Sequence, residues 1–483
     1  MAGWATGGST AGWLDWYLRQ NLPAGRSLSG RVGWREFRVK PLSLQTAVSR
    51  RDQIARNTTT TTTTTLGAPV PRFIHCHAFC CGLNPAMVAA AFFGLLLLPS
   101  AVMVAAEMRL VRFGPAPADI AAVPSEVLES LYSGNSLEAL KQNGLDQRFV
   151  AAMYNRKRRP GFLDLTDVQS ADHLDSSEPG SQQALTAPVP TYPTPNATVH
   201  PELKSFFKEI SPAALEGTIS SLGGFHNRYF RGPYSRAASI WVRDAFAKVL
   251  VGDDSVTLFD HSPAFNQPSV IARIPSSRNA NGSVTIISAH LDSINDQQRA
   301  NGLAPGADDD ASGIAVLLEV ARILREAKWK PAEGHILELH AYGGEEGGLL
   351  GSARVAADYK LRRIPVRAVL QLDMVAYQRE KLPVITILRD TGGADLQGFA
   401  SKLIKAYIPN STVYENECNY PCSDHFSWHE QGYPALSIDE SGEHDKYLNP
   451  YAHTANDSID KLDMTLASAF VKLALAWAVE LTT

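Results

Sequence analysis

The sequence contains little cysteine for its length and has no excess of charge of either sign. Five cysteines occur among 483 residues, and 45 basic side chains stand against 49 acidic ones, for a formal net charge of -4. Because no basic face is interleaved with aromatic residues, nucleic acid is not expected as a partner. No internal repeat is present. A hydrophobic content of 45% and a charged content of 19% instead indicate a soluble globular protein with an ample core.

The first 106 residues divide into two parts. Residues 1–86 are rich in Gly, Ser and Arg and include eight consecutive threonines, which predicts a disordered or over-extended N-terminal segment. Residues 87–106, MVAAAFFGLLLLPSAVMVAA, end in small residues and are typical of a secretory signal peptide cleaved after Ala106. The alternative is a transmembrane anchor, because the apolar stretch is nearly long enough to cross a bilayer. With cleavage, we expect a secreted, extracellular protein without stable membrane association.

The remaining cysteines support an oxidising compartment. Only Cys418 and Cys422 follow the proposed cleavage site. Because a second cysteine pair for a thiolate metal site is missing, we predict that these two residues form a disulfide. Four Asn-X-Ser/Thr triplets are candidate glycosylation sites, which would suit a secreted glycoprotein: Asn196, Asn281, Asn410 and Asn456.

Residues 107–186 carry no cluster of chemically reactive side chains. A helix is expected over residues 125–143, followed by a basic run and an acidic, Ser-rich stretch. We interpret this region as a removable propeptide, which would make the protein a zymogen; the alternative is an accessory region. The Pro-rich residues 187–201 are expected to form an extended linker, and the catalytic domain is placed at residues 187–483.

The catalytic region alternates between two periodicities. The runs SVTIISAHLD, HILELHAY and AVLQLDMVAY are typical of buried strands, whereas ASGIAVLLEVARILREA and residues 465–481 have helical spacing. This alternation predicts an α/β fold with a mostly parallel central β-sheet and helices on both faces.

Side chains that bind metals occur where the expected strands end. They are His290 with Asp292, the triplet 308–310, Glu345 with Glu346, Asp373 and His453. Imidazole and carboxylate groups suit zinc, and one aspartate can bridge two ions through its two oxygens. Two ions about 3.5–4 Å apart can activate a water and stabilise an oxyanion. The spacing alone does not decide which aspartate of the triplet is the bridge.

Four motifs in this order, GADDDASG, GGEEGGLLGS, QLDMVAY and HTANDS, resemble the signatures of secreted M28-family zinc aminopeptidases, particularly the fungal leucine aminopeptidases. The resemblance extends over residues 190–483. It implies the zinc-dependent exopeptidase fold and two Zn²⁺ per chain. The expected activity is hydrolysis of apolar, leucine-like residues from peptides with a free N-terminus, by a protein that we expect to be a monomer.

The resemblance also implies individual roles for the metal-type residues. Asp309 resembles the bridging ligand and is expected to be followed by a cis peptide bond. The implied ligands of one zinc are Asp309, Glu346 and His453, and those of the other are His290, Asp309 and Asp373. Asp308 and Asp310 would then have supporting roles.

Four further roles follow from the same resemblance. Glu345 looks like the general base on the attacking water, and it would later protonate the departing amine. Asp292 matches an aspartate that orients the ligand histidine. Tyr420 matches a donor to the developing oxyanion, with packing on the disulfide loop as its alternative role. Met374 and Tyr420 are candidates for the wall of the substrate pocket. Three neighbours are expected to be structural or to support the pocket: Asp424, His425 and His429.

Two other functions are consistent with part of this pattern. One is a single-zinc acyltransferase that cyclises N-terminal glutamine, which five intact ligands disfavour. The other is a catalytically inactive receptor-type ectodomain, which the presence of Glu345 disfavours.

Overall fold

The computed structural model describes residues 108–114, 119–125, 127, 162–166, 191–252, 254–277 and 282–483. All of them lie in the second of two compact units, Ser100–Thr483. The predicted extension, the signal peptide, most of the propeptide region and the triplet at Asn281 lie outside these residues. Of the helix expected over residues 125–143, only Ser125 and Val127 are described, and both are helical.

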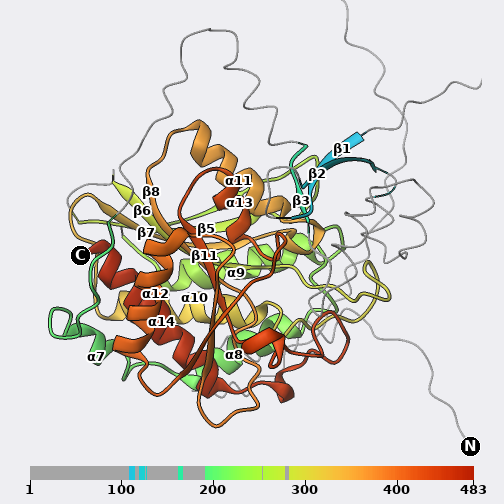
Figure 1. Cartoon of the computed structure of the whole chain (residues 1–483). Coiled ribbons are helices and arrows are strands. Elements are labelled where there is room, and N and C mark those ends of the chain that lie inside the picture. Colours follow the sequence, from blue (N-terminus) through green and yellow to red (C-terminus); the bar gives the residue numbers. More distant parts are fainter. Residues whose placement is uncertain are drawn as a thin grey trace, which may run out of the picture. The chain divides into compact units, whose positions relative to one another are not determined.

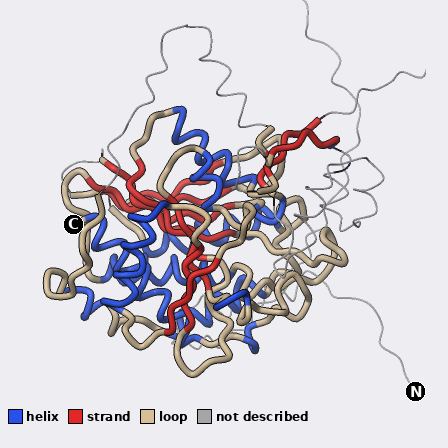
Figure 2. Tube along the Cα trace, viewed as in Figure 1, coloured by secondary structure: helices blue, strands red, loops and turns tan. Residues whose placement is uncertain are grey.

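The described part of the catalytic region is built on an eight-stranded sheet, ordered β10-β9-β11-β8-β6-β7-β5-β4. Figure 2 shows these strands running through the middle of the fold between helices. Their bounds are β4 Ser255–Phe259, β5 Ser269–Pro275, β6 Ser283–His290, β7 His335–Tyr342, β8 Val366–Leu372, β9 Val384–Leu388, β10 Thr412–Asn416 and β11 Ala435–Asp439.

The prediction of a mostly parallel sheet is confirmed at its centre. Strands β7, β6, β8 and β11 are parallel neighbours, and β9 and β10 pair in parallel with each other. Antiparallel pairing occurs where β5 meets β7, where β4 meets β5 and where β9 meets β11. The parallel centre matters for function, because it brings the carboxyl ends of several strands to one edge.

Helices cover both faces of the sheet, as predicted, and Figure 1 shows α11 and α13 on the opposite side from α10, α12 and α14. Along β6, Ile286 packs with residues of α11 and α13, whereas the adjacent Ile287 packs with α10 and α14, as expected from alternating side chains. The helices are α7 Glu202–Phe206, α8 Pro212–Gly223, α9 Ser235–Val249, α10 Ala311–Glu326, α11 Leu350–Leu361, α12 Gly393–Tyr407, α13 His425–Glu430 and α14 Met464–Thr482. The short 3₁₀ helices are η1 Glu345–Gly347, η2 Glu443–Asp445 and η3 Ile459–Lys461.

Helix α14 is the long apolar helix expected near the C-terminus. By length and composition it is the one helix among the described residues that is apolar enough to cross a membrane, yet 78% of its apolar window is buried inside the fold. Trp477 on this helix is fully buried and packs edge-to-face on Phe399 of α12, with the two ring centroids 5.5 Å apart. The helix therefore serves as a core element that packs against α10 and the sheet.

A small three-stranded sheet in the region predicted as a propeptide packs on the catalytic fold. Its strands are β1 Met108–Arg112, β2 Ile120–Pro124 and β3 Leu163–Asp164, all paired antiparallel. Phe162 packs in one hydrophobic cluster with Phe230 and Leu350, and Arg112 makes a 2.7 Å ion pair with Glu430 of α13. These contacts were not expected from the sequence. Whether the segment is removed remains a prediction.

The described part of the predicted linker, Thr191 to Pro201, has no regular structure but lies against the fold. The ring of Tyr192 packs 5.6 Å from that of Phe399, and its hydroxyl donates to the carbonyl of Arg367. An aromatic anchor of this kind fixes the start of the catalytic region.

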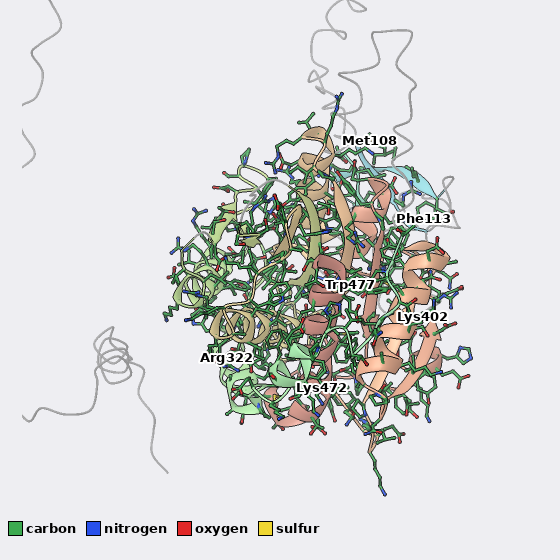
Figure 3. All side chains as sticks on the ribbon, turned by 90° about the vertical axis from the view of Figure 1, so that its left-hand side faces the viewer. Met108, Phe113, Arg322, Lys402, Lys472 and Trp477 are labelled. Carbon is green, nitrogen blue, oxygen red and sulfur yellow. A yellow bond between two sulfur atoms is a disulfide. The ribbon has the colours of Figure 1, made fainter. Side chains whose placement is uncertain are left out.

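We predict that Trp477→Ala lowers the free energy of unfolding by about 3–5 kcal/mol, because it leaves a large cavity between α14 and α12. Figure 3 shows Trp477 in the interior and Lys402 at the surface. Chemical denaturation measures the change, with Lys402→Ala as a control that should shift stability by less than about 0.5 kcal/mol. Equal effects of the two substitutions would contradict the placement of α14 in the core.

Candidate active site

The site lies at the carboxyl edge of the parallel strands. His290 is the last residue of β6 and pairs in register with Tyr342, the last residue of β7. The glutamate loop, residues 343–348, follows β7, and Asp373 follows β8 directly. Adjacent parallel strands therefore place an imidazole and carboxylates side by side. His453 reaches the same edge from the loop between β11 and α14, with its backbone in the left-handed region at φ 58°.

Five predicted ligands form two overlapping groups whose ligand atoms lie within 4.8 Å of one another: His290, Asp309 and Asp373, and Asp309, Glu346 and His453. Asp309 belongs to both groups. Its Oδ1 lies 3.0 Å from Nε2 of His290, and its Oδ2 lies 3.0 Å from Nε2 of His453. In the first group, Oδ1 of Asp373 lies 3.5 Å from Nε2 of His290. In the second group, Oε2 of Glu346 lies 3.0 Å from Nε2 of His453.

The donor atoms of both groups fit a pair of cations. Two ligand atoms at a tetrahedral zinc with bonds of about 2.0–2.2 Å lie about 3.3–3.6 Å apart, close to the distances above. Nε2 of His290 and Oε1 of Glu346 are buried without a hydrogen-bond partner. Buried polar atoms are rarely left unsatisfied, and these are atoms that metal coordination would satisfy.

The electrostatics of the group also require positive charge. Burial by itself would raise the pKa of Asp309, but His453 and His290 together hold it well below the ordinary value. Burial opposes the charged form of His453, yet Glu346 and Asp309 raise its pKa to about 10. Without metal, the carboxylates thus draw protons onto the imidazoles. Three carboxylates facing two imidazoles leave a net negative charge that divalent cations would neutralise.

Asp292 links the histidine to the glutamate loop. Its Oδ1 faces Nδ1 of His290 at 3.6 Å. The same carboxylate accepts hydrogen bonds from the backbone N–H groups of Glu345 and Glu346, at 2.9 and 3.1 Å. One buried carboxylate therefore sets the position of a ligand imidazole and of both glutamates, which extends the orienting role predicted for it.

Glu345 has the protonation behaviour of a partly buried base. Desolvation raises its pKa well above the ordinary value, the nearby carboxylates Glu346 and Asp373 raise it further, and His290 opposes them. A raised pKa brings a carboxyl group closer to neutral pH, where it both accepts and returns a proton efficiently. Bound cations would offset part of this shift.

The other two aspartates of the triplet hold the backbone, as expected. Asp310 caps the N-terminus of α10 by accepting from the N–H of Gly313, and it also accepts from the N–H of His290 at 2.9 Å. Asp308 accepts from the N–H of Ala376 at 2.9 Å. The peptide bond between Asp309 and Asp310 is cis, as the resemblance implied.

Several supporting residues were missed from the sequence. Asp457 accepts from the N–H groups of Asp308 and Asp309, at 3.1–3.2 Å, and thereby fixes the bridge. Ser423 donates to Oδ2 of Asp373 at 2.5 Å, and Asp296 lies 3.3 Å from Nδ1 of His453. Asp457 was within reach of sequence reasoning, because it is part of the HTANDS motif; the others have no local signal.

The disulfide predicted between Cys418 and Cys422 is present. Tyr420 is buried and packs with Leu388 and Cys418, which is the packing role considered for it. Met374 directly follows Asp373, is partly buried, and has a left-handed backbone with φ of 61°. Strain of this kind concentrates at functional sites, so both residues remain candidates for the substrate pocket.

The remaining residues singled out in the sequence lie outside the two ligand groups. Asp424 and His425 are buried at the start of α13, and His429 is exposed near its end. Neither histidine joins the ligand groups, in line with the structural roles expected for them. The side chains of the three described glycosylation candidates are exposed: Asn196, Asn410 and Asn456.

Comparison with known proteins agrees with this geometry. The model of peptidase family M28 matches residues 269–478. Leucine aminopeptidase 1 of Grosmannia clavigera is 33% identical over 338 residues, which cover 68% of this chain and 80% of the relative. A probable leucine aminopeptidase of Trichophyton verrucosum is 32% identical over 360 residues, which cover 73% of this chain and 90% of the relative. The crystal structure of the LapA aminopeptidase of Legionella pneumophila superposes with a TM-score of 0.61 at 25% identity, covering 78% of this chain and 99% of LapA.

An α/β fold with imidazoles and carboxylates at the carboxyl edge of its sheet defines a class of metal-dependent exopeptidases. Within that class, the chain belongs to peptidase family M28. It is a metallo-aminopeptidase, a hydrolase that acts on peptides.

We predict that Asp292→Ala lowers kcat/KM roughly 10- to 100-fold, because two backbone N–H groups of the glutamate loop and the imidazole of His290 lose their shared acceptor. Asp292→Asn should restore only part of the loss, since an amide offers one acceptor oxygen. Steady-state peptide hydrolysis measures both changes. Asp244→Ala removes an exposed carboxylate on α9 and is the control. Wild-type rates in both Asp292 variants would show that the carboxylate does not position the loop.

Proposed function

We propose that this aminopeptidase is a secreted enzyme that uses two zinc ions to release apolar, leucine-like residues from peptide N-termini. The observation that supports it best is the position of Asp309, whose two oxygens each lie 3.0 Å from a different imidazole. A carboxylate shared in this way suits two cations better than one. The leucine preference rests on the printed names of the fungal relatives.

His290, Asp309 and Asp373 would hold one ion, and Asp309, Glu346 and His453 the other. When bound, two such ions lower the pKa of a water and polarise the carbonyl of the scissile peptide bond. The buried carboxylates of the site also suit the positive charge of a substrate's free α-amine. A peptide whose amine is blocked would lose this interaction.

Glu345 would transfer the proton in the reaction. It is in the electrostatic field of His290, Glu346 and Asp373, and its backbone is held by Asp292 at 2.9 Å. It would take a proton from the water as that water attacks the carbonyl carbon, and return it to the amine nitrogen as the C–N bond breaks. Atoms and charge then balance, since the water supplies the hydroxyl of the new acid and the proton of the new amine.

Tyr420 and Met374 would complete the site. Tyr420 is proposed as the donor to the developing oxyanion, because the disulfide loop holds it in a buried position. Met374, beside Asp373, is proposed as part of the wall that contacts the apolar side chain of the substrate.

Secretion is proposed from the apolar segment at residues 87–106, the disulfide and the exposed glycosylation candidates Asn196, Asn410 and Asn456. Cleavage within residues 107–186 would yield the mature enzyme. Its monomeric state is also a proposal. A cleaved signal peptide would leave no stable membrane anchor in the described part, because α14 packs into the core.

The two alternative functions are less well supported. A single-zinc glutaminyl cyclase has no use for a bridging aspartate between two imidazoles. A catalytically inactive receptor-type ectodomain has no use for Glu345 beside the full set of ligands. Both alternatives predict no release of N-terminal residues from ordinary peptides.

We predict about two zinc ions per chain by elemental analysis, and loss of peptide hydrolysis on chelation with recovery on adding zinc. Glu345→Gln should keep both ions and fold normally while kcat falls roughly 10²- to 10⁴-fold, because the amide cannot accept the proton. A metal content of zero or one, or a fully active Gln variant, would contradict this mechanism.

We also predict that hydrolysis requires a free α-amine and favours an apolar first residue. Matched peptides that begin with Leu, Lys, Glu or N-acetyl-Leu should be compared by kcat/KM, with mass spectrometry to identify the products. The Leu peptide should be cleaved fastest and the acetylated peptide not at all. Cleavage of the acetylated peptide would rule out the proposed contact of the amine with the site.

A further inference from the structure

Arg228 lies in the loop between α8 and α9 and is one of the largest fully buried side chains, with 1% exposure. Its guanidinium makes hydrogen bonds to backbone carbonyl oxygens alone among the described residues. No carboxylate of the described part forms an ion pair with it. A buried cation is costly unless its surroundings compensate, so the retention of an arginine here requires a physical reason.

The guanidinium joins the two ends of the long loop between β6 and α10, residues 291–310, and both ends lie beside metal-type ligands. Nε donates to the carbonyl of Leu291 at 2.8 Å, and one terminal nitrogen, Nη2, donates to the carbonyl of Gly306 at 2.8 Å. Leu291 lies between His290 and Asp292, and Gly306 lies three residues before Asp309. The other terminal nitrogen donates to the carbonyl of Pro305. One planar group therefore fixes the distance between the two ends of this loop.

The backbone of Arg228 extends these links to the glutamate loop, residues 343–348. Its N–H donates to Oγ of Ser293 at 3.0 Å, and its carbonyl accepts from Nε2 of Gln267 at 3.0 Å. Oε1 of the same Gln267 accepts from the N–H of Gly344 at 3.1 Å, directly before the glutamate pair. Arg228 thus binds both ends of the loop between β6 and α10 directly, and it reaches the loop after β7 through Gln267.

The fit around the guanidinium is tight. At Gly306, φ is +51° and an added Cβ would lie 2.8 Å from Nη2 of Arg228 and 2.5 Å from Cβ of Ser293. A side chain at this position would be strained by the backbone and would displace the guanidinium. Gly306 and Arg228 therefore fit one another closely, and a side chain at position 306 would not fit beside the guanidinium.

The charge of Arg228 also faces the acidic cluster. Burial lowers the pKa of its guanidinium, whereas Asp457, Asp309, Asp292 and Asp310 raise it. Carbonyl dipoles and this surrounding negative field compensate the buried cation. A purely packing role would be served as well by an apolar side chain, since apolar replacement of buried ionic groups is often neutral or stabilising.

We propose that Arg228 is a positioning residue for the metal centre. It holds the segments that carry His290, Asp309 and the glutamate pair at the spacing that two cations require. It does so through the backbone and Gln267, without contacting a ligand side chain. The role rests on the proposed two-zinc function. It predicts that loss of the guanidinium weakens zinc binding, and that cutting only the link through Gln267 slows the reaction with a smaller effect on zinc binding.

The test uses the full chain with Arg228→Met, which keeps length and apolar contact, and Arg228→Lys, which keeps the charge but offers three donors instead of a planar fork. Zinc affinity is measured by competition with a chromophoric chelator, and folding by thermal unfolding of the metal-free protein. We expect affinity to fall roughly 10- to 100-fold in the Met variant and less in the Lys variant. Arg273→Met, which breaks the partly buried ion pair with Glu338, is the control for general destabilisation and should keep wild-type zinc affinity.

Gln267→Met separates the two links and covers the case in which Arg228→Met does not fold. It removes the bridge between the carbonyl of Arg228 and the N–H of Gly344. We expect a lower kcat, a nearly unchanged KM and a smaller loss of zinc affinity than in Arg228→Met, because the released loop carries Glu345 and only one ligand, Glu346, while the other ligands are retained.

The outcomes distinguish this inference from the proposed function. If the wild-type chain binds no zinc, the two-zinc function fails. If the wild type binds zinc but a folded Arg228→Met variant has the same affinity and kcat, the positioning role is overturned. Should that variant not fold, wild-type zinc affinity in Arg228→Lys together with wild-type kcat in Gln267→Met overturns it equally. Loss of zinc affinity in Arg273→Met to the same extent would also contradict it.

Discussion

The carboxylate of Asp309, held between the imidazoles of His290 and His453 at 3.0 Å on each side, is the constraint on which the site depends. It must stay buried and ionised, which is unfavourable unless positive charge faces both oxygens. The fold meets this requirement through the backbone. Asp457 accepts from the N–H of Asp309, and the N-cap residue of α10, Asp310, fixes the adjoining helix and the N–H of His290.

The parallel centre of the sheet explains how a few ligands that are distant in the sequence come together at one site. Strands β6, β7 and β8 end at one edge, and each delivers its ligand within a residue or a few residues of its end. Hydrogen bonds then cross between the loops: Asp292 reaches the glutamate pair, and Ser423 reaches Asp373. The catalytic geometry is therefore a property of several loops held together, in which rigid strands set the coarse spacing and buried polar side chains set the fine spacing.

The sequence predicts secondary structure accurately where the signal is local. Periodicity predicted the strand that ends at His290 and the helix at residues 464–482 within one or two residues, because burial repeats every two or 3.6 residues. It did not predict the antiparallel edges or the packing of β1, β2 and β3 on the catalytic fold, since pairing partners distant in sequence leave no local pattern. Spacing could not choose Asp309 from its neighbours, and only the resemblance did so. Arg228 and Gln267 were missed because a lone buried polar residue looks like a surface residue in sequence.

The most direct test of the account is anomalous diffraction at the zinc edge from crystals of the zinc-loaded protein. A two-metal centre should give two peaks about 3.5–4 Å apart, one on each side of the Asp309 carboxylate, near His290 and His453 respectively. A single peak, or peaks that do not share Asp309, would contradict the claim that this carboxylate organises a two-metal centre.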